Sequence, residues 1–350
     1  MFDASEPFIC GIILAAGDGR RLQQYIRRLR GDALPKQYFN FIGTRSMLEH
    51  TFDRVERLVS SDRLLTVVSK HHLKYVEVRQ QLSGRPRSTL VIQPENKETG
   101  PGLLLPLMHL YKRYPDSVAA VFPSDHFILE EQRFMSYVHL ATQAVTRDPS
   151  RIILLAIEAR EPETEYGYVL PGKDIKNLAP FKMQRVLRFV EKPDAKVARK
   201  LITAGGLWNT MTMVFKVKTL LTLASKICPG LYSSFRRVHE AIGTPDEKRT
   251  VGEVYQSLEP MNFSKDVLEK IVENYPESIS VLPVRQVYWS DWGSPTRVIQ
   301  VLRRTGHLTR VGALSESKLM TIWQRQLVKD RETHLDSNPA NRTGLAKGIS

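Results

Sequence analysis

The sequence predicts an α/β protein with a mixed, mostly parallel sheet and helices on both faces. Between residues 8 and 156, apolar runs that resemble strands alternate with segments of helical period. These runs are continuously apolar, as in parallel strands buried on both faces, rather than alternately apolar and polar. With 350 residues, 42% of them hydrophobic, the chain is long enough for one large domain with appendages.

The first half of the chain shows this alternation most clearly. A strand, a covering helix and a second parallel strand form the repeating unit of such sheets. We expect strands at residues 8–16, 63–69, 89–93, 118–122 and 151–156, and helices at residues 46–59, 71–82, 101–114 and 134–146.

The second half has a less regular order of elements, which we expect to complete the sheet. The expected strands are at 166–170, 184–190, 207–217 and, as a pair, 278–283 and 287–289, and the expected helices are at 195–204 and within 218–272.

The same pattern predicts the domain organisation. We expect one domain over residues 1–300, with its two halves at about 1–157 and 158–300. A helical extension at 301–334 and a polar, disordered tail at 335–350 should follow.

Charge and hydropathy indicate which kinds of partner the chain is suited to bind. The formal net charge of +14 favours anionic partners. The basic residues are spread along the chain and form no helix-turn-helix, zinc finger or aromatic-rich ribonucleoprotein motif, so we expect no nucleic-acid partner. No apolar run approaches the roughly 18–20 residues that a membrane span needs, so we expect no membrane partner.

The cysteines and the first residues indicate the compartment. Cys10 and Cys228 are the two cysteines of the chain, too few for a disulfide framework or a thiolate zinc site. The N-terminal MFDASEP is acidic and has no basic leader-like region. We therefore expect a cytoplasmic protein.

The stretch LAAGDGRRL at residues 14–22 is the first candidate for chemistry. It follows the first predicted strand, where a glycine-rich turn lets backbone N–H groups approach an anion. Gly17 and Gly19 fit neither the G-x-x-x-x-G-K-[ST] phosphate loop nor a dinucleotide fingerprint with a third glycine. Taken alone, the stretch fits an ordinary strand-to-helix turn equally well.

Two further motifs place charged groups near this loop. LPKQY contains Lys36, which offers a point charge for phosphates. FPSDHFI places Asp125 just past another predicted parallel strand, at the same edge of the sheet. A carboxylate beside such cations suits Mg²⁺, and Asp291 in WSDWGS is the candidate for a second ligand. Both aspartates also fit helix N-caps.

Taken together, eight segments resemble the nucleoside-diphosphate-sugar pyrophosphorylases, and most closely their mannose-1-phosphate guanylyltransferase branch. In order, they are LAAGDGRRL, LPKQY, QPENKETGPG, FPSDHF, EYGYVLPG, RFVEKPD, LWNTMTMVF and WSDWGSP, and they cover about residues 9–300. The resemblance implies a Rossmann-like α/β fold and a Mg²⁺-dependent reaction of a nucleoside triphosphate with a sugar 1-phosphate. The expected substrates are GTP and mannose 1-phosphate, and the expected products are a nucleotide-sugar and pyrophosphate.

For the nucleotide, the resemblance implies that the glycine loop wraps the triphosphate. Arg21 and Lys36 would neutralise the leaving pyrophosphate, while Asp125 and Asp291 would hold the Mg²⁺. The residues implied in nucleotide binding are Ala15, Ala16, Gly17, Asp18, Gly19, Arg20, Arg21, Lys36, Gln93, Glu98, Thr99, Pro123 and Asp125.

For the sugar phosphate, the resemblance implies a site made by Tyr166, Gly167, Glu191, Lys192 and Asn209. Lys192 would contact the phosphate and would belong, with Arg21, Lys36 and Asp125, to the catalytic residues. From the residues alone, Glu191 and Lys192 also fit a charged strand end, and Asn209 fits a turn residue.

Some positions depart from the family pattern. Near the base, Gln93 and Glu98 stand where glutamate and asparagine are usual, and Thr210-Met211 replaces Ser-Gly, which would crowd the sugar pocket. These departures leave open another substrate pair, such as dTTP, UTP or CTP with glucose 1-phosphate, and a catalytically silent regulatory relative.

Three features have no assigned role. Arg20 stands where threonine or serine is usual, and the arginine-rich insertion at 23–33 fits either a lid or a solvated basic turn. The helical extension leaves a homodimer open. We expect His71 and His72 to be a solvated helix start and His126 to orient the loop of Asp125, with no metal role for these histidines.

Overall fold

The computed structural model describes residues 7–307. By its internal contacts the chain divides into Met1–Gly293 and Ser294–Ser350, and each unit is described by itself. Predictions that fall on residues 308–350, including the tail and most of the helical extension, lie outside the described residues.

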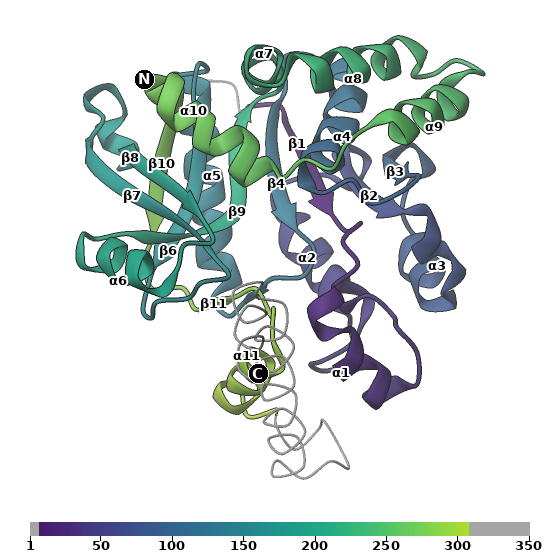
Figure 1. Ribbon diagram of the computed structural model, residues 1–350, viewed down its shortest axis with the longest axis horizontal. Helices are drawn as coiled ribbons and strands as arrows, with labels where there is room; N and C mark the ends of the chain where they lie inside the picture. The colour runs from purple at the N-terminus through teal and green to yellow at the C-terminus, as the bar shows by residue number, and fades with distance from the viewer. Residues whose placement is uncertain (1–6, 308–350) are drawn as a thin grey trace, which may run out of the picture. The chain divides into compact units, whose positions relative to one another are not determined.

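The first unit is built on a nine-stranded sheet of order β3-β2-β1-β4-β9-β6-β10-β8-β7 (Figure 1). Its strands are β1 (Ile9–Leu14), β2 (Leu64–Ser69), β3 (Leu90–Gln93), β4 (Val118–Pro123), β6 (Ile152–Glu158), β7 (Gly167–Asp174), β8 (Gln184–Glu191), β9 (Leu207–Lys216) and β10 (Ile279–Val284).

The sheet is mixed, as predicted, but it is not mostly parallel. β3, β2, β1 and β4 pair in parallel, as do β6 and β10. β9 runs antiparallel to both β4 and β6, and β8 runs antiparallel to β10 and β7. Parallel pairing therefore holds for β1, β2, β3 and β4 and for β6 with β10, but not for β7, β8 and β9. A strand such as β9 is buried on both faces whatever its direction, so its apolar run does not reveal that direction.

The helices cover both faces of the sheet, as predicted. They are α1 (Arg20–Arg30), α2 (Met47–Val55), α3 (Val76–Ser83), α4 (Thr99–Arg113), α5 (Glu131–Arg147), α6 (Ala195–Thr203), α7 (Val217–Ile227), α8 (Pro229–Ala241), α9 (Glu247–Ser257) and α10 (Glu269–Asn274).

The residues of β1 face the two sides of the sheet alternately, and different helices cover each side. Cys10 and Ile12 belong to an apolar cluster with α4, α7, α8 and α9. Gly11 faces the other way, since a Cβ there would lie 3.6 Å from Val55 of α2. α5 packs with α2 and against β4, β6 and β9.

A separate two-stranded sheet joins β5 (Phe127–Ile128) to β11 (Trp289–Ser290). The predicted pairing of strands 278–283 and 287–289 is therefore wrong. β10 pairs with β6 and β8, while the second segment pairs with β5, which follows Asp125 closely.

The arginine-rich insertion is largely helical, so it is not a simple basic turn. α1 buries Leu22, Tyr25 and Ile26 and ends at Gly31, whose positive φ of 96° suits a left-handed cap. Arg30 pairs with Asp32 at 2.7 Å and also with Glu77. An amphipathic helix anchored by three buried side chains explains how so basic a segment stays ordered.

In the second unit, α11 (Pro295–Arg304) begins at Ser294, whose side chain accepts from the N–H of Arg297. Ser294, not Asp291, is therefore the N-cap of this helix. A strand, not a helix, follows Asp125, so the capping alternative fails for both aspartates.

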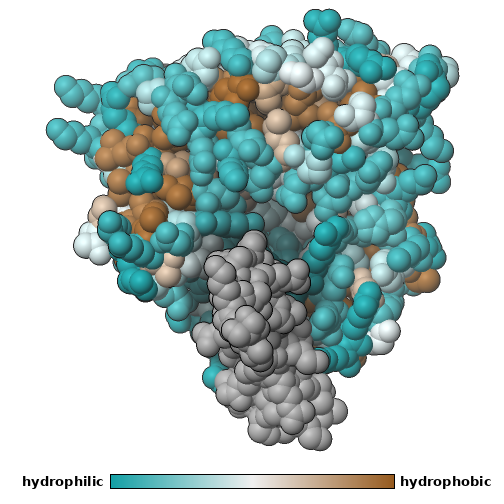
Figure 2. Space-filling model, viewed as in Figure 1, coloured by the Kyte–Doolittle hydropathy of each residue, from teal (hydrophilic) through white to brown (hydrophobic). Residues whose placement is uncertain are grey.

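The face seen in Figure 2 is mainly hydrophilic, with separate apolar patches. Within residues 7–307, no helix combines the length and the apolar character that crossing a membrane requires.

Candidate functional site

The glycine loop lies between β1 and α1, at the edge where β1 and β4 both end. Gly19 has a φ of 61°, and a Cβ there would meet the backbone N of Lys36 at 3.2 Å. Leu14 pairs with Pro123 in the register of the two strands. The loop and the Asp125 segment therefore leave the sheet side by side, as predicted.

Two residues that sequence reasoning missed hold this loop. Gln37 donates to the carbonyls of Ala15 at 2.7 Å and Gly17 at 2.8 Å, and the Tyr38 hydroxyl donates to Ala15 at 2.8 Å. With these carbonyls engaged, the loop has a defined shape. The one sequence signal that could have identified these two residues was their position directly after Lys36 in LPKQY.

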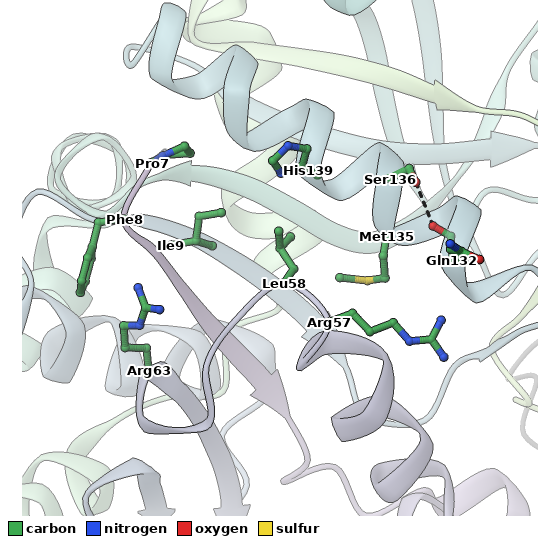
Figure 3. A pocket seen from close by; sticks show the side chains of 10 residues that line it. All are labelled: Pro7, Phe8, Ile9, Arg57, Leu58, Arg63, Gln132, Met135, Ser136 and His139. Atoms are coloured by element: carbon green, nitrogen blue, oxygen red, sulfur yellow. Dashed lines mark hydrogen bonds between the residues drawn. The ribbon is translucent and has the colours of Figure 1, made fainter. Parts of the chain in front are cut away.

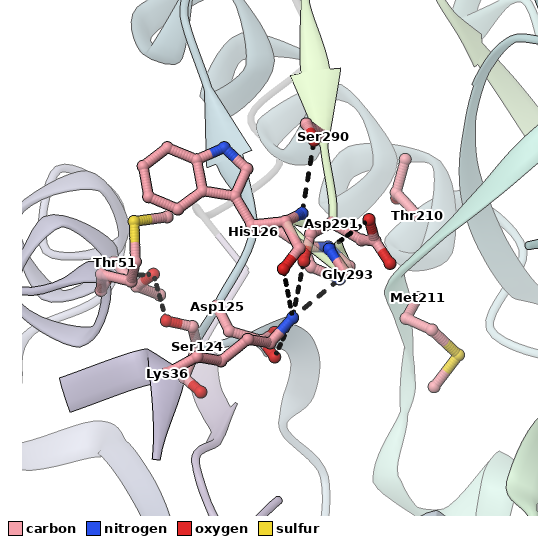
Figure 4. A network of polar contacts seen from close by, with 12 residues as sticks. Lys36, Thr51, Ser124, Asp125, His126, Thr210, Met211, Ser290, Asp291 and Gly293 are labelled. Carbon is pink, nitrogen blue, oxygen red and sulfur yellow. Dashed lines mark hydrogen bonds and ion pairs between the residues drawn. The ribbon is translucent and has the colours of Figure 1, made fainter. Parts of the chain in front are cut away.

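Lys36 lies at the centre of the polar network in Figure 4. Its ammonium is buried, 3.0 Å from Asp125 Oδ2, and donates to the backbone carbonyls of Asp291 at 2.7 Å and Trp292 at 3.3 Å. One side chain of the first half thus joins the two predicted metal-binding segments.

The β5–β11 pairing brings Asp291 to this place. Ser290 is opposite Phe127 in antiparallel register, so the next residue, Asp291, comes opposite His126. Asp291 Oδ1 accepts from the Tyr166 hydroxyl at 3.0 Å, and Oδ2 accepts from Arg21 at 3.3 Å. Sequence positions 270 residues apart therefore meet in one cluster.

Arg21 also pairs with Glu165 at 2.7 Å, through a guanidinium that is about half exposed. It can turn toward a phosphate because the buried Asp291 keeps the hydrogen bond from Tyr166 and Glu165 is open to solvent. Glu165 was not predicted as a site residue, although it stands beside Tyr166 in the EYGYVLPG segment.

His126 supports the aspartate segment. The Trp289 indole donates to His126 Nδ1 at 3.2 Å, and His126 Nε2 lies 3.8 Å from Asp125 Oδ1. Burial lowers the pKa of His126 to about 4, while Asp125 and Asp291 act to raise it. A neutral imidazole held on both sides agrees with the expected orienting role.

The donor set fits the Mg²⁺ that the sequence implies. Asp125 and Asp291 supply hard carboxylate oxygens, which Mg²⁺ prefers, and they share an edge with two cations that can bind phosphates. The positive charge of Lys36 is paired with Asp125, and that of Arg21 with Asp291.

On the sugar side, Gly167, Glu191 and Asn209 come together. Gly167 is paired with Glu191 in the β7–β8 register, and a Cβ on Gly167 would lie 2.6 Å from Glu191 Oε2 and 3.5 Å from Asn209 Cβ. The glycine thus makes room for the carboxyl group. Burial raises the pKa of Glu191 to about 7, with Lys192 lowering it and Glu269 and Glu165 raising it.

Lys192 follows Glu191 with a φ of 49° and donates its backbone N–H to Tyr166 at 3.1 Å. Its side chain is exposed. The left-handed backbone turns the chain at the end of β8 and leaves the ammonium in solvent, where an anionic ligand can reach it.

Thr210 and Met211, the pair expected to crowd the sugar pocket, both make hydrogen bonds within the fold. The Thr210 hydroxyl donates to the Leu155 carbonyl at 2.7 Å and is buried. Met211 has a φ of 56°, donates its N–H to Asn209 Oδ1 and accepts from Ser264 through its sulfur at 3.0 Å. Thr210 is therefore used within the fold, and Met211 adopts a left-handed backbone conformation that glycine would adopt without strain.

A cavity of about 130 Å³ lies between the glycine loop and the start of α4. Its lining residues are Leu14, Ala16, Gly17, Val67, Gln93, Asn96, Glu98, Thr99 and Gly102. The side-chain oxygen of Gln93 is buried and has no hydrogen-bond partner among the described residues. Thr99 is already engaged, because its hydroxyl accepts from the N–H of Phe263 at 2.8 Å.

The prediction of a solvated His71-His72 pair is wrong for His72, whereas His71 is half exposed. The two residues lie in the 3₁₀ helix Lys70–Lys74, separate from α3, and His72 is fully buried. Both imidazoles contact Asp18. Burial raises the pKa of Asp18, but hydrogen bonds from Asn96 and His72 outweigh it, so this pKa lies below its usual value.

The exposed Arg20 lies 3.6 Å from the other Asp18 oxygen. Arg20 thus has a partner within the glycine loop itself.

A larger cavity, of about 950 Å³, opens beside the other end of β1 and is lined by residues such as Phe8, Arg57 and His139 (Figure 3). None of the predicted site residues lines it.

Comparison with known proteins agrees with this geometry. The model of a family described as nucleotidyl transferase matches residues 10–306. The chain is 26% identical over 297 residues to the xanthan biosynthesis protein XanB of Xanthomonas campestris pv. campestris, and equally to a mannose-1-phosphate guanylyltransferase of Escherichia coli. Each alignment covers 84% of this chain and 60% of the relative, so the chain spans about 60% of the length of these proteins.

Among solved structures, the fold is similar to that of a protein described as mannose-1-phosphate geranyltransferase from Thermus thermophilus. The TM-score is 0.68 at 25% sequence identity, over 81% of this chain and 76% of that one.

Proposed function

Because the chain belongs to the nucleotidyl transferase family, we propose that it transfers GMP from GTP to mannose 1-phosphate, forming GDP-mannose and pyrophosphate. The observation that carries this proposal is the meeting of Lys36, Arg21, Asp125 and Asp291 at one edge of the sheet. Transfer between phosphates needs cations that neutralise phosphate charge and carboxylates that hold Mg²⁺, and these four side chains would supply both.

The proposed chemistry needs no general base. A sugar-phosphate oxygen is ionised at neutral pH and can attack the α-phosphate directly. The rate then depends on in-line positioning and on neutralising the charge around the α-phosphate. Positioned cations and oriented backbone N–H groups are suited to both tasks.

In this mechanism the cations exchange partners. Arg21 leaves Glu165 and Asp291 to contact the β- and γ-phosphates as pyrophosphate departs, and Lys36 contributes its charge from the Asp125 side. Asp125 and Asp291 would hold Mg²⁺, which when bound neutralises phosphate charge between the two substrates.

The sugar phosphate would lie between β7, β8 and β9. Glu191 and Asn209 flank Gly167 and would bind sugar hydroxyls, while the exposed Lys192 would contact the phosphate. Tyr166 links this half to the metal site, because its hydroxyl donates to Asp291.

The cavity beside the glycine loop supports guanine as the base. Its lining includes two residues that carry acceptors, Gln93, whose side-chain oxygen has no partner among the described residues, and the exposed Glu98. Guanine offers adjacent donors at N1–H and the N2 amine, whereas uracil and thymine offer one N–H between two carbonyls. An acceptor-rich pocket therefore favours GTP.

The test is a matrix of five nucleoside triphosphates against mannose, glucose, galactose and N-acetylglucosamine 1-phosphates, with Mg²⁺, scored by pyrophosphate release. The proposal expects the GTP and mannose 1-phosphate pair to be fastest. A different best pair would overturn the substrate assignment, and no release in any combination would favour a regulatory role.

A further inference from the structure

We propose that Asp18, His71 and His72 form a second metal site, which takes a divalent transition-metal ion such as Zn²⁺. His71 Nε2 lies 3.0 Å and His72 Nε2 lies 3.3 Å from the same oxygen, Asp18 Oδ1. The three ligand atoms all lie within 4.8 Å of one another. An ion with bonds of about 2.0–2.2 Å to each would need separations near those observed.

Each imidazole is held through its other nitrogen. His71 Nδ1 is 2.7 Å from the Ser69 hydroxyl, and His72 Nδ1 is 3.4 Å from the Tyr38 hydroxyl. Both Nε2 atoms are thereby aimed at the same point. Metal-binding histidines commonly have such a partner, which fixes the ring orientation and the tautomer.

The surroundings are those of a built site rather than a surface cluster. His72 is fully buried, the Asp18 side chain is 13% exposed, and the two rings meet edge to face with centroids 4.3 Å apart. His71 is half exposed, which leaves a path for an ion. Asn96 donates to Asp18 Oδ2 at 3.3 Å and so leaves Oδ1 to the histidines.

The ligand types distinguish this site from the Asp125–Asp291 pair. Two imidazoles and one carboxylate suit Zn²⁺ and its neighbours in the first transition row, whereas Mg²⁺ prefers oxygen ligands. Three protein ligands leave at least one coordination position open.

The position of Asp18 places the proposed metal site beside the expected triphosphate. It stands between Gly17 and Gly19, in the loop that the proposed function assigns to the triphosphate. An ion held there could bind a phosphate oxygen at its open position. This consequence rests on the proposed function, whereas metal binding itself does not.

The experiment titrates the metal-free full chain with Zn²⁺ alone, without nucleotide, by calorimetry, and records the visible spectrum with Co²⁺ in its place. Asp18→Asn and His71→Gln are the site variants, since His71 is half exposed and Asn matches Asp in size. His239→Gln is the matched control, because His239 packs on Tyr111, away from the cluster.

We expect one equivalent of Zn²⁺ to bind with imidazole ligands visible in its X-ray absorption spectrum. Both site variants should weaken this binding by about 100-fold or more, with the control unchanged. Absence of stoichiometric binding, or equal binding in the site variants, would overturn the proposal and identify the cluster as a brace for the loop. Because the readout needs no turnover, an inactive protein that binds Zn²⁺ would reject the proposed function alone.

Discussion

The Lys36 ammonium lies 3.0 Å from Asp125 and also donates to the carbonyl of Asp291. We expect Lys36→Met to abolish turnover and to lower the free energy of unfolding by about 2 kcal/mol, because it leaves buried acceptors unpaired. Urea unfolding checks the second value. Lys218→Met is the control, since its exposed pair with Asp116 should contribute little to stability.

Asp125→Ala and Asp291→Ala should each lower kcat by about 100-fold or more if these carboxylates hold the ion that neutralises phosphate charge. Circular dichroism should show the fold retained. Asp116→Ala removes an exposed carboxylate far from the cluster and should leave kcat unchanged. Full activity in either site variant would contradict the metal assignment.

Arg21→Ala should slow pyrophosphate release and lower kcat by about 100-fold, the usual cost of losing a charge that stabilises a leaving group. Arg28→Ala, an exposed arginine on the same helix, serves as its control. Pre-steady-state pyrophosphate detection separates this effect from substrate binding. Equal loss in both variants would mean that only the general charge of α1 matters.

Glu98→Gln should raise KM for GTP by about tenfold while leaving kcat nearly unchanged, since a base contact is the same in the ground and transition states. The exposed Glu95, paired with Lys97, provides the control Glu95→Gln. A change in kcat without a change in KM would place Glu98 away from the base.

The raised pKa of Glu191, about 7, predicts a pH-dependent stability. Between its ordinary value near 4.5 and 7, the folded protein keeps a proton that the unfolded chain has lost. Stability therefore falls as pH rises through this interval, by about 3 kcal/mol. Glu191→Gln should remove this part of the slope, whereas the exposed Glu240→Gln should keep it; identical slopes in wild type and Glu191→Gln would contradict the burial of this carboxyl group.

Much of the fold could be predicted because the hydropathy of neighbouring residues indicates the alternation of strands and helices. The first four strands of the sheet, their parallel direction and the place of the glycine loop follow from that pattern. Strand direction in the second half could not be predicted, since β9 is buried on both faces and its apolar run looks the same in either direction. The β5–β11 pair is too short to leave a pattern of its own.

For the candidate site, the sequence by itself determined which residue types were available: a glycine loop, cations at Arg21 and Lys36, and aspartates at the ends of apolar runs. Only the tertiary structure decided that Asp291 comes to Lys36, that Gln37 and Tyr38 shape the loop, and that His71 and His72 converge on Asp18. The physical reason is that composition and motif are properties of neighbouring residues, whereas burial and convergence depend on strand register and packing between segments distant in the chain.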